Sequence, residues 1–425
     1  MAELILKKGK EKSLLRRHPW VYDTAVERAV GNPKAGDTVK VVAKDGRFLA
    51  WAAYSPVSAL RARCWSFRED EVIDDIWFEK KIREAVAARA GLLERTNARR
   101  ILFGEADGLP GLIVDQYGDW LVTQFQAAGV EAHRELIGRL LLEVTGARGV
   151  YDRSDAATRR REGLEVRSEV LVGETAPDVI EIVEDGVKYG VDVRVGHKTG
   201  FYIDQRESRL SAQRAAEEFR RRHGRGLRAL NCFCYTGGFS LALLKGGAEE
   251  VVSVDSSEEA LAMARANAER NGFTNRAEWL CEDVFTCLRR LRDAGEKFDL
   301  VILDPPKFAS SHYHVDRAAR AYKDINLNGL KLLGPGGELF TFSCSGAIDV
   351  DLFQKIVAGA VIDSGVTAWA TGRFGAGEDH PLLMTCPDLW TTHPLSSGLP
   401  LFLIPELRAV SGNLRQPEVK CFAYK

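Results

Sequence analysis

A short apolar run that ends in an acid and two prolines constrains the fold of this chain more than any other segment. Leu300-Val301-Ile302-Leu303 has the length and composition of a fully buried strand. Asp304-Pro305-Pro306-Lys307-Phe308 follows at once, and proline cannot continue a central strand because it has no backbone N–H to donate. Open α/β sheets bind ligands at the carboxyl ends of their strands. The run therefore predicts an α/β domain that holds the carboxylate of Asp304 at its ligand-binding edge.

From about residue 205 the chain alternates strand and helix patterns, which is typical of a parallel, doubly wound sheet. We expect strands at 227–233, 251–255, 298–303 and 339–342, and helices over 206–222 and 257–271. The first strand leads into a turn with Gly237 and Gly238, where the absence of a Cβ lets the backbone approach a ligand. The turn lacks the Gly-x-Gly-x-x-Gly spacing of a pyrophosphate site.

Three acids lie at successive strand ends after this turn. Asp255 follows it by about 20 residues, the distance expected of an acid that bonds both ribose hydroxyls. Asp283 follows the next short strand, where it can bond an adenine amino group, and Asp304 comes third. A glycine turn and three strand-end acids in this order describe the class I fold that binds S-adenosylmethionine.

Composition excludes several other classes of protein. The 425 residues leave room for about three domains, and no apolar stretch approaches the ~20 residues that cross a bilayer. The first eight residues carry their charges after the apolar residues, which is not the pattern of a signal peptide. The eight cysteines show no Cys-x-x-Cys and no Cys/His ligand spacing. We therefore expect no metal site, no disulfide scaffold and no membrane segment, and a location in the reducing cytoplasm.

The net charge of −1 does not predict a polyanionic partner, but its distribution is uneven. Basic residues gather at 7–18, 159–167 and 220–228. Such patches can follow RNA phosphates, and solvated helix faces or loops are the alternative for each of them.

Several longer motifs occur in order along the chain. They are Arg17-His18-Pro19-Trp20-Val21, Asp107-Gly108-Leu109-Pro110-Gly111-Leu112, the run 196–206, the run 230–239, Val254-Asp255-x-Ser257, Asn267-x3-Asn271-Gly272 and Asp304–Phe308. From about residue 4 to about residue 387 this pattern resembles the large-subunit ribosomal RNA methyltransferase I family. The resemblance implies an RNA-binding PUA domain at 1–72, an α+β middle domain at 73–195, a Rossmann-like class I methyltransferase domain at 196–387 and an atypical tail at 388–425. Members of the family methylate carbon 5 of a cytidine in large-subunit ribosomal RNA.

Methylation at carbon 5 requires a nucleophile, because that carbon does not attack a methyl group unaided. A thiolate that adds to carbon 6 makes carbon 5 enamine-like. In the family pattern Cys344, just past the strand 339–342, is that nucleophile, and Asp304 bonds the N3/N4 edge of the base. A small buried hydrophobe is the alternative for Cys344.

The resemblance also implies the binding residues. The cofactor residues are Tyr202, Asp204, Arg206, Asn231, Phe233, Tyr235, Gly237, Asp255, Asp283, Asp304 and Pro305. The first three match a segment over the methionine end of the cofactor, for which a surface hairpin leading into a helix cap is the alternative. The RNA-binding residues are Arg17, His18, Trp20 and Lys307. Trp20 could equally belong to the core of its small domain, and Lys307 could equally be solvated.

The family pattern breaks after Thr385-Cys386-Pro387, where the family closes with a strand at the sheet edge. Residues 388–425 carry four prolines and no clean final strand, and 399–404 is the one plausible substitute. Two other functions stay open: methylation of a guanine or adenine nitrogen, since Asp-Pro-Pro motifs also serve such enzymes, and a non-catalytic RNA-binding role in ribosome assembly. The oligomeric state, including a homodimer, is also open.

Overall fold

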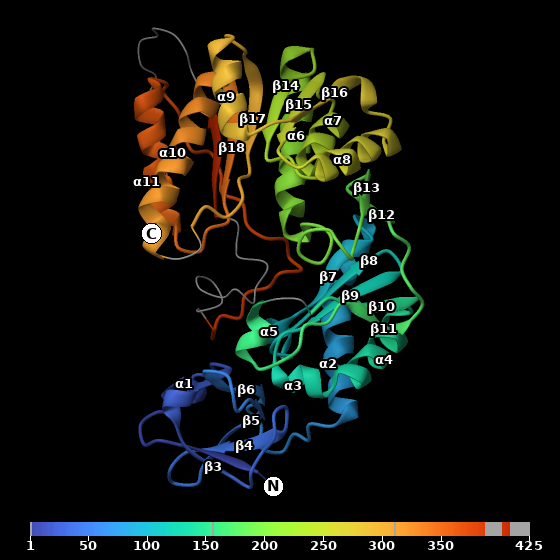
Figure 1. Cartoon of the computed structure of the whole chain (residues 1–425), viewed down its shortest axis with the longest axis vertical. Helices are drawn as coiled ribbons and strands as arrows, with labels where there is room; N and C mark the ends of the chain where they lie inside the picture. The colour runs from blue at the N-terminus through green and yellow to red at the C-terminus, as the bar shows by residue number, and fades with distance from the viewer. Residues whose placement is uncertain (1, 155–156, 310–311, 387–401, 409–425) are drawn as a thin grey trace. The chain divides into compact units, whose positions relative to one another are not determined.

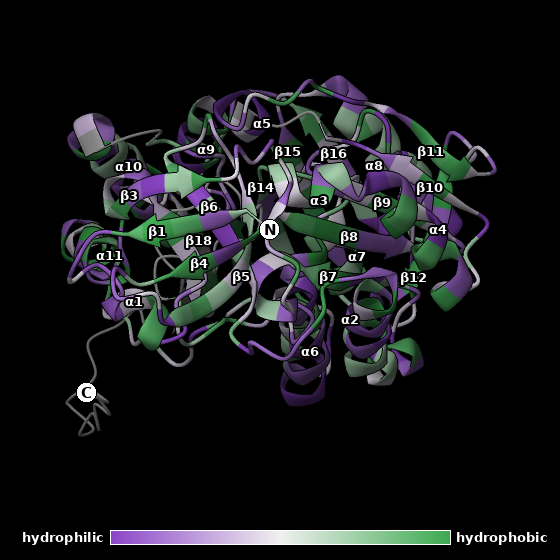
Figure 2. Ribbon diagram, turned by 90° about the horizontal axis from the view of Figure 1, so that it is seen from below, coloured by the Kyte–Doolittle hydropathy of each residue, from purple (hydrophilic) through white to green (hydrophobic). Residues whose placement is uncertain are grey.

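The computed structural model describes residues 2–154, 157–309, 312–386 and 402–408 (Figure 1). The chain forms two compact units. The first comprises Met1–Arg214, Ala262–Thr274 and Gly375–Leu401, and the second comprises Ala215–Leu261, Asn275–Phe374 and Phe402–Lys425. Helices α6 (Arg206–His223) and α8 (Glu258–Arg270) have residues in both units. Figure 2 shows α6 mainly in the hydrophilic colour, in keeping with its many charged residues.

The first unit begins with a six-stranded sheet in the order β2-β6-β5-β4-β1-β3. Its elements are β1 (Glu3–Leu6), α1 (Lys12–Leu15), β2 (Trp20–Tyr22), β3 (Val26–Val30), β4 (Thr38–Val42), β5 (Phe48–Tyr54) and β6 (Leu60–Ser66). Alternate residues such as Val39 and Val41 on β4 point into the core, while Lys40 between them is only half-buried. Residues Glu3–Ser66 therefore form a small β-rich module.

The rest of the first unit is a second sheet in the order β11-β10-β9-β8-β7, followed by a two-stranded hairpin. Its elements are α2 (Asp75–Ala88), β7 (Ala98–Phe103), β8 (Leu112–Tyr117), β9 (Trp120–Phe125), α3 (Ala128–Ala132), α4 (Arg134–Thr145), β10 (Gly149–Asp152), α5 (Ala157–Arg161), β11 (Glu169–Gly173), β12 (Ile180–Glu184) and β13 (Val187–Val191). Asp74 caps α2 by accepting a hydrogen bond from the N–H of Trp77 at 2.9 Å. The core contains the edge-to-face rings of Trp65, Trp77 and Phe78.

The second unit is the doubly wound domain, with a sheet in the order β16-β15-β14-β17-β18-β19. Its strands are β14 (Arg228–Cys232), β15 (Glu250–Asp255), β16 (Ala277–Cys281), β17 (Phe298–Leu303), β18 (Leu333–Ser343) and β19 (Phe402–Arg408). Its helices are α7 (Gly238–Lys245), α9 (Val284–Asp293), α10 (Val315–Leu332) and α11 (Val350–Ser364). Helices α10 and α11 pack side by side (Figure 1), and a buried core joins α9, α10 and α11 to the central strands.

The strand order places a topological switch point between β14 and β17, the two strands from which the chain winds outward in opposite directions. The expected strands and helices of this domain are confirmed, although β18 begins six residues before the predicted 339. The predicted lack of a clean closing strand needs correction. β19 pairs antiparallel with β18 and overlaps the suggested 399–404 segment, and its pairing is irregular between Leu339 and Thr341, opposite the region of Pro405. An edge strand tolerates a proline because one of its sides needs no partner.

Within the described residues, no helix is long and apolar enough to cross a membrane.

Candidate active site

The turn after β14 has a backbone shape that few sequences adopt. Phe233 and Tyr235 have φ angles of +60° and +49°, and Gly237 has φ +84° at the start of α7. Non-glycine residues enter this left-handed region at a cost in free energy, so the surrounding structure must hold them there. Asp255 does so, because its Oδ2 accepts a hydrogen bond from the N–H of Tyr235 at 2.8 Å. Strand β15 thereby fixes the loop that β14 presents at the switch point.

Asp255 is the acid predicted to bond the ribose. Its Oδ1 accepts from the N–H of Ser257 at 3.0 Å, so both carboxylate oxygens are oriented by backbone donors. Each oxygen has a further lone pair, so the carboxylate can still accept hydrogen bonds from a ligand. The predicted contact of Asp255 with a ribose stays a prediction.

Asn231 lies at the end of β14 and is fully buried. Its Nδ2 donates to Ser240 Oγ at 2.8 Å, and Ser240 Oγ lies 2.8 Å from Ser253 Oγ. Its Oδ1 is buried without a hydrogen-bond partner anywhere in the described parts of the chain. A buried acceptor left unpaired costs about 1–3 kcal/mol, so this oxygen at the switch point suits a donor supplied by a ligand.

Asp283 has a structural task that the sequence analysis did not include. It is the N-cap of α9, and its Oδ1 accepts from the N–H and the hydroxyl of Thr286 at 2.9 and 3.0 Å. This cap accounts for an acid before the helix without any ligand. The predicted contact of Asp283 with an adenine amino group stays a prediction, in which Oδ2 would accept the hydrogen bond.

Cys344 and the Asp304 loop lie together. Strands β17 and β18 are parallel and pair Leu303 with Thr341, so residues that follow both strands meet at one edge of the sheet. The Cys344 thiol donates to the carbonyl oxygen of Pro305 at 3.6 Å. Asp304 and Cys344 are both half-buried, and Lys307 is exposed on the same loop. A candidate nucleophile therefore adjoins the loop that carries the candidate base-binding acid.

Two residues of this region, Tyr322 and Ser345, were missed by the sequence analysis. Ser345 adjoins Cys344, and its Oγ accepts from the N–H of Ala309 at 3.1 Å. Tyr322 lies on the inner face of α10 with its phenol 2.9 Å from Ser345 Oγ. Helical spacing shows only that Tyr322 is buried and does not distinguish it from an ordinary core tyrosine. In the sequence, only the position of Ser345 next to the expected nucleophile Cys344 could have pointed to this contact.

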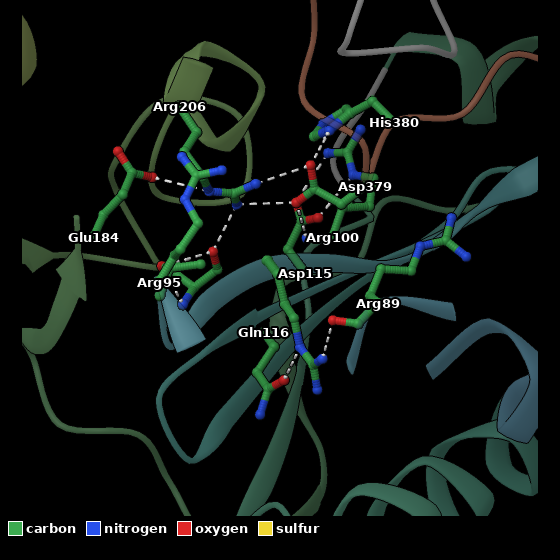
Figure 3. A network of polar contacts seen from close by, with 12 residues as sticks. Arg89, Arg95, Arg100, Asp115, Gln116, Glu184, Arg206, Asp379 and His380 are labelled. Atoms are coloured by element: carbon green, nitrogen blue, oxygen red, sulfur yellow. Dashed lines mark hydrogen bonds and ion pairs between the residues drawn. The ribbon is translucent and has the colours of Figure 1, made fainter. Parts of the chain in front are cut away.

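The predicted cofactor residue Arg206 lies in the first unit and is 0% exposed. Its guanidinium donates to both carboxylate oxygens of Asp379, at 3.1 and 3.0 Å, and to the carbonyl oxygen of Ala98 at 2.8 Å. Figure 3 shows it between Glu184 and Asp379, with Glu184 at 3.4 Å. Arg206 is therefore part of a buried ion-pair cluster, which supports a structural role for it, and its predicted cofactor role stays a prediction.

The two other residues predicted at the methionine end have different settings. Asp204 is 2% exposed, and its Oδ2 accepts from Lys198 Nζ at 2.6 Å. Burial opposes ionisation of this carboxyl, but Lys198 and other nearby cations outweigh it and lower its pKa. Its Oδ1 is buried with no partner in the described residues. Tyr202 is half-buried, and its ring lies 4.5 Å below the Lys198 ammonium. Asp204 thus keeps one acceptor for a ligand, and the roles of Asp204 and Tyr202 stay predictions.

The predicted RNA residues at the amino terminus differ in exposure. Arg17 is exposed, with φ +60°, and lines a cavity of about 480 Å³ together with Lys81 and Glu105. Trp20 is 2% exposed and donates from Nε1 to Glu105 at 2.8 Å. A buried indole cannot stack on a base, so the core alternative holds for Trp20.

His18 is half-buried against Trp20. Its Nδ1 accepts from the N–H of Trp20 at 3.2 Å, and its Nε2 lies 3.7 Å from the thiol of Cys386. Both ring nitrogens of His18 therefore have partners within the first unit. Arg17 is exposed, and its contact with an RNA phosphate stays a prediction.

Two family models match the chain. One describes an S-adenosylmethionine-dependent methyltransferase and matches residues 106–361, and the other describes a PUA-like domain and matches residues 4–67. A SAM-dependent methyltransferase from Streptococcus mutans has a similar fold, with a TM-score of 0.75 at 22% identity over 96% of this chain and all of that one. A second solved methyltransferase, complexed with SAH, gives a TM-score of 0.76 at the same identity and coverage.

Relatives of much higher identity carry a more specific name. Ribosomal RNA large subunit methyltransferase I of Klebsiella pneumoniae is 46% identical over 388 residues, which cover 91% of this chain and 95% of that protein. The protein of the same name from Aeromonas hydrophila is 47% identical over 391 residues, 91% of this chain and 96% of that protein. The chain therefore belongs to the ribosomal RNA large subunit methyltransferase I family, a family of S-adenosylmethionine-dependent enzymes with an amino-terminal PUA-like domain.

Proposed function

We propose that the protein methylates carbon 5 of a cytidine in large-subunit ribosomal RNA, with Cys344 as the nucleophile and Asp304 as the residue that holds the base. The observation that supports this most is the hydrogen bond from the Cys344 thiol to the Pro305 carbonyl oxygen at 3.6 Å, which sets a thiol beside the Asp304 loop. Methylation of a ring or amino nitrogen needs no thiol there, because those nitrogens attack a methyl group directly.

The thiol loses its proton before the first bond forms. The Cys344 thiolate then adds to carbon 6 of the cytosine, and the electrons of the 5,6 double bond become available at carbon 5. Asp304, through the N3/N4 edge, stabilises the charge that develops on the ring. After carbon 5 has gained the methyl group, a base removes its proton, the 5,6 double bond re-forms and the bond from Cys344 to carbon 6 breaks. The thiolate is regenerated, and one proton is released for each methyl group transferred.

S-adenosylmethionine supplies the electrophilic methyl group when bound. We propose that Asp255 holds its ribose, that Asp283 and Asn231 bond further polar groups, and that the loop containing Phe233, Tyr235 and Gly237 lies against it. Asp304, Pro305, Tyr202 and Asp204 complete the proposed cofactor set. The strained backbone of that loop and the unpaired oxygens of Asn231 and Asp204 support this assignment.

We further propose that ribosomal RNA, in the cytoplasm, is approached through Arg17 of the amino-terminal domain and Lys307 beside the site. Both side chains are exposed. Exposed cations contribute to RNA affinity by releasing counterions from the phosphates.

One experiment separates carbon methylation from nitrogen methylation. Wild type and Cys344→Ala are incubated with labelled S-adenosylmethionine and unmodified large-subunit RNA, and with the same RNA containing 5-fluorocytidine. Carbon methylation predicts an RNA–protein adduct on the fluorinated RNA for wild type only, and no methyl transfer by Cys344→Ala. Full methyl transfer by Cys344→Ala would refute the covalent mechanism and favour nitrogen methylation. No methyl transfer by wild type would favour a non-catalytic role in ribosome assembly.

A further inference from the structure

Tyr322 contacts both loops of the proposed active site from a third element, α10. Its ring packs against Phe308 of the Asp304–Phe308 loop, with the centroids 4.8 Å apart, and against Phe353 of α11 at 5.3 Å. Its phenol lies 2.9 Å from Ser345 Oγ, beside Cys344. Tyr322 is therefore joined to the acid-bearing loop by ring packing and to the thiol-bearing loop by a hydrogen bond.

Ser345 extends this connection. Its Oγ accepts from the N–H of Ala309 at 3.1 Å, while its own N–H lies 3.4 Å from Ser343 Oγ. A serine hydroxyl has one donor and two acceptor positions, so Ser345 can bond Ala309 and Tyr322 at the same time. The hydroxyl thus links residue 309, just past the Asp-Pro-Pro motif, to the residue that follows Cys344.

Burial makes these bonds costly to lose. Tyr322 is 0% exposed and Ser345 is 3% exposed, so neither hydroxyl finds water as a substitute partner. Burial is the main cause that raises the pKa of Tyr322 to about 12, with hydrogen bonds from Ser343, Ser345 and the backbone at Phe308 acting in the opposite direction. At neutral pH the phenol is therefore protonated and able to donate.

We propose that Tyr322 is a positioning residue that, through Ser345, holds the Cys344 thiol at its working distance from the Asp304 loop. The role in the reaction rests on the proposed function, whereas the mechanical role concerns only where the thiol lies. Neither hydroxyl touches the substrate, and both act by limiting the movement of Cys344. A displacement of about 1 Å in a reacting group can cost on the order of 100-fold in rate, so a bond that prevents such movement has a large effect.

Tyr322→Phe tests this proposal, because it removes only the hydroxyl and keeps the ring contacts with Phe308 and Phe353. We expect kcat to fall about tenfold while KM for RNA and for S-adenosylmethionine changes by less than about twofold, the pattern of a group that acts in the transition state. Ser345→Ala should have the same effect, the double variant no more than either one, and Ser345→Thr, which keeps a hydroxyl, should retain most of the rate.

A second readout needs neither RNA nor cofactor. Alkylation of each cysteine by N-ethylmaleimide is followed by mass spectrometry of the peptides. In Tyr322→Phe the half-buried Cys344 should react about threefold faster or more, since its loop is released. The buried Cys232, Cys234 and Cys287 of the same unit should stay as slow as in wild type, and the exposed Cys281 provides the reference rate. A rise at all buried cysteines together means general loosening and overturns the proposal, as does an unchanged Cys344 with an unchanged kcat.

The two proposals fail in different ways. If Cys344→Ala methylates RNA at full rate, the proposed function is lost, but the alkylation rates still decide whether Tyr322 positions the thiol. If wild type forms the adduct and Tyr322→Phe forms it equally fast, the proposed function stands and the positioning role is refuted.

Discussion

Removal of the Asp379 carboxylate tests how the first unit is held together. Asp379 is fully buried and accepts from two nitrogens of Arg206 and from the backbone N–H of Arg100 at 3.0 Å. Glu184 serves both Arg206 and Arg209, with Arg209 Nε at 2.6 Å. Asp379, Glu184, Arg206 and Arg209 carry two charges of each sign (Figure 3 shows Glu184, Arg206 and Asp379 of this cluster). Asp379→Ala leaves one positive charge without compensation in a dry environment.

The magnitude follows from these contacts. Removing one partner of a buried ion pair costs about 3–5 kcal/mol, because the remaining charge is neither paired nor hydrated. We take about 4 kcal/mol, since Glu184 at 3.4 Å still offsets part of the charge on Arg206. With an m value of about 2–3 kcal/mol/M, the urea midpoint of the first unit should fall by about 1.3–2 M. Fluorescence of the buried Trp65 and Trp77 reports that transition.

Two further variants make the test specific. Asp70→Ala removes the carboxylate of an exposed ion pair with Arg68 and should leave the midpoint unchanged. Arg206→Met combined with Asp379→Leu removes both charges and should recover most of the loss, since apolar replacement of a buried pair is often close to neutral. An Asp379→Ala midpoint equal to that of Asp70→Ala would refute the reasoning.

Three further predictions concern pH, the cofactor and RNA. Burial raises the pKa of Asp379, but His380 and Arg206 outweigh it and hold the folded pKa below the ordinary value of 3.8. The contribution of Asp379 to stability is therefore present above that value and is lost as the pH falls below it. Urea midpoints between pH 6 and 3 should therefore fall more steeply for wild type than for Asp379→Asn, and parallel curves would contradict this. Asp255→Ala should weaken binding of S-adenosylhomocysteine roughly 10- to 150-fold by calorimetry, the equivalent of about 1.5–3 kcal/mol for hydrogen bonds to a charged group, while unchanged affinity would remove Asp255 from the site. Lys307→Ala should reduce the slope of log K against log salt for RNA by about 0.7, the value for one phosphate of a single strand, whereas Lys245→Ala, at an exposed lysine of α7, should not.

The doubly wound domain was predictable because its signals are local. A strand buried on both faces is a continuous apolar run, as at 300–303, and an acid or glycine directly after it marks the ligand edge. For the closing strand β19 the sequence offered only the segment 399–404 as a candidate. The four prolines at 388–425 argue against a strand, and β19 forms by pairing with β18, which the local sequence does not show. Strand propensity is a property of one segment, whereas an edge strand forms only when it pairs with the neighbouring strand.

The same distinction explains which site residues were predictable. Asp255 is the last residue of β15, and Asp304 and Cys344 directly follow β17 and β18, so their position along the chain fixes the edge on which they lie. Arg206 was predicted as a ligand-binding residue from its charge, and Trp20 from its aromatic ring. Their hydrogen-bond partners, Asp379 and Glu105, are 173 and 85 residues away in the chain. A sequence pattern cannot show that a guanidinium or an indole already donates to a carboxylate far away in the chain.

Tyr322 extends this argument to the residues that no motif contains. Its position on α10 shows only that it is buried, and its phenol matters because Ser345, 23 residues later, comes within 2.9 Å of it. Asp255, Asp304 and Cys344 of the proposed site lie at strand ends, where a motif can be recognised, but residues that hold them in place can come from any element packed behind the site. The order of motifs along the chain predicts the chemistry, whereas the proposed positioning of Cys344 rests on hydrogen bonds of Tyr322 and Ser345 that no motif contains.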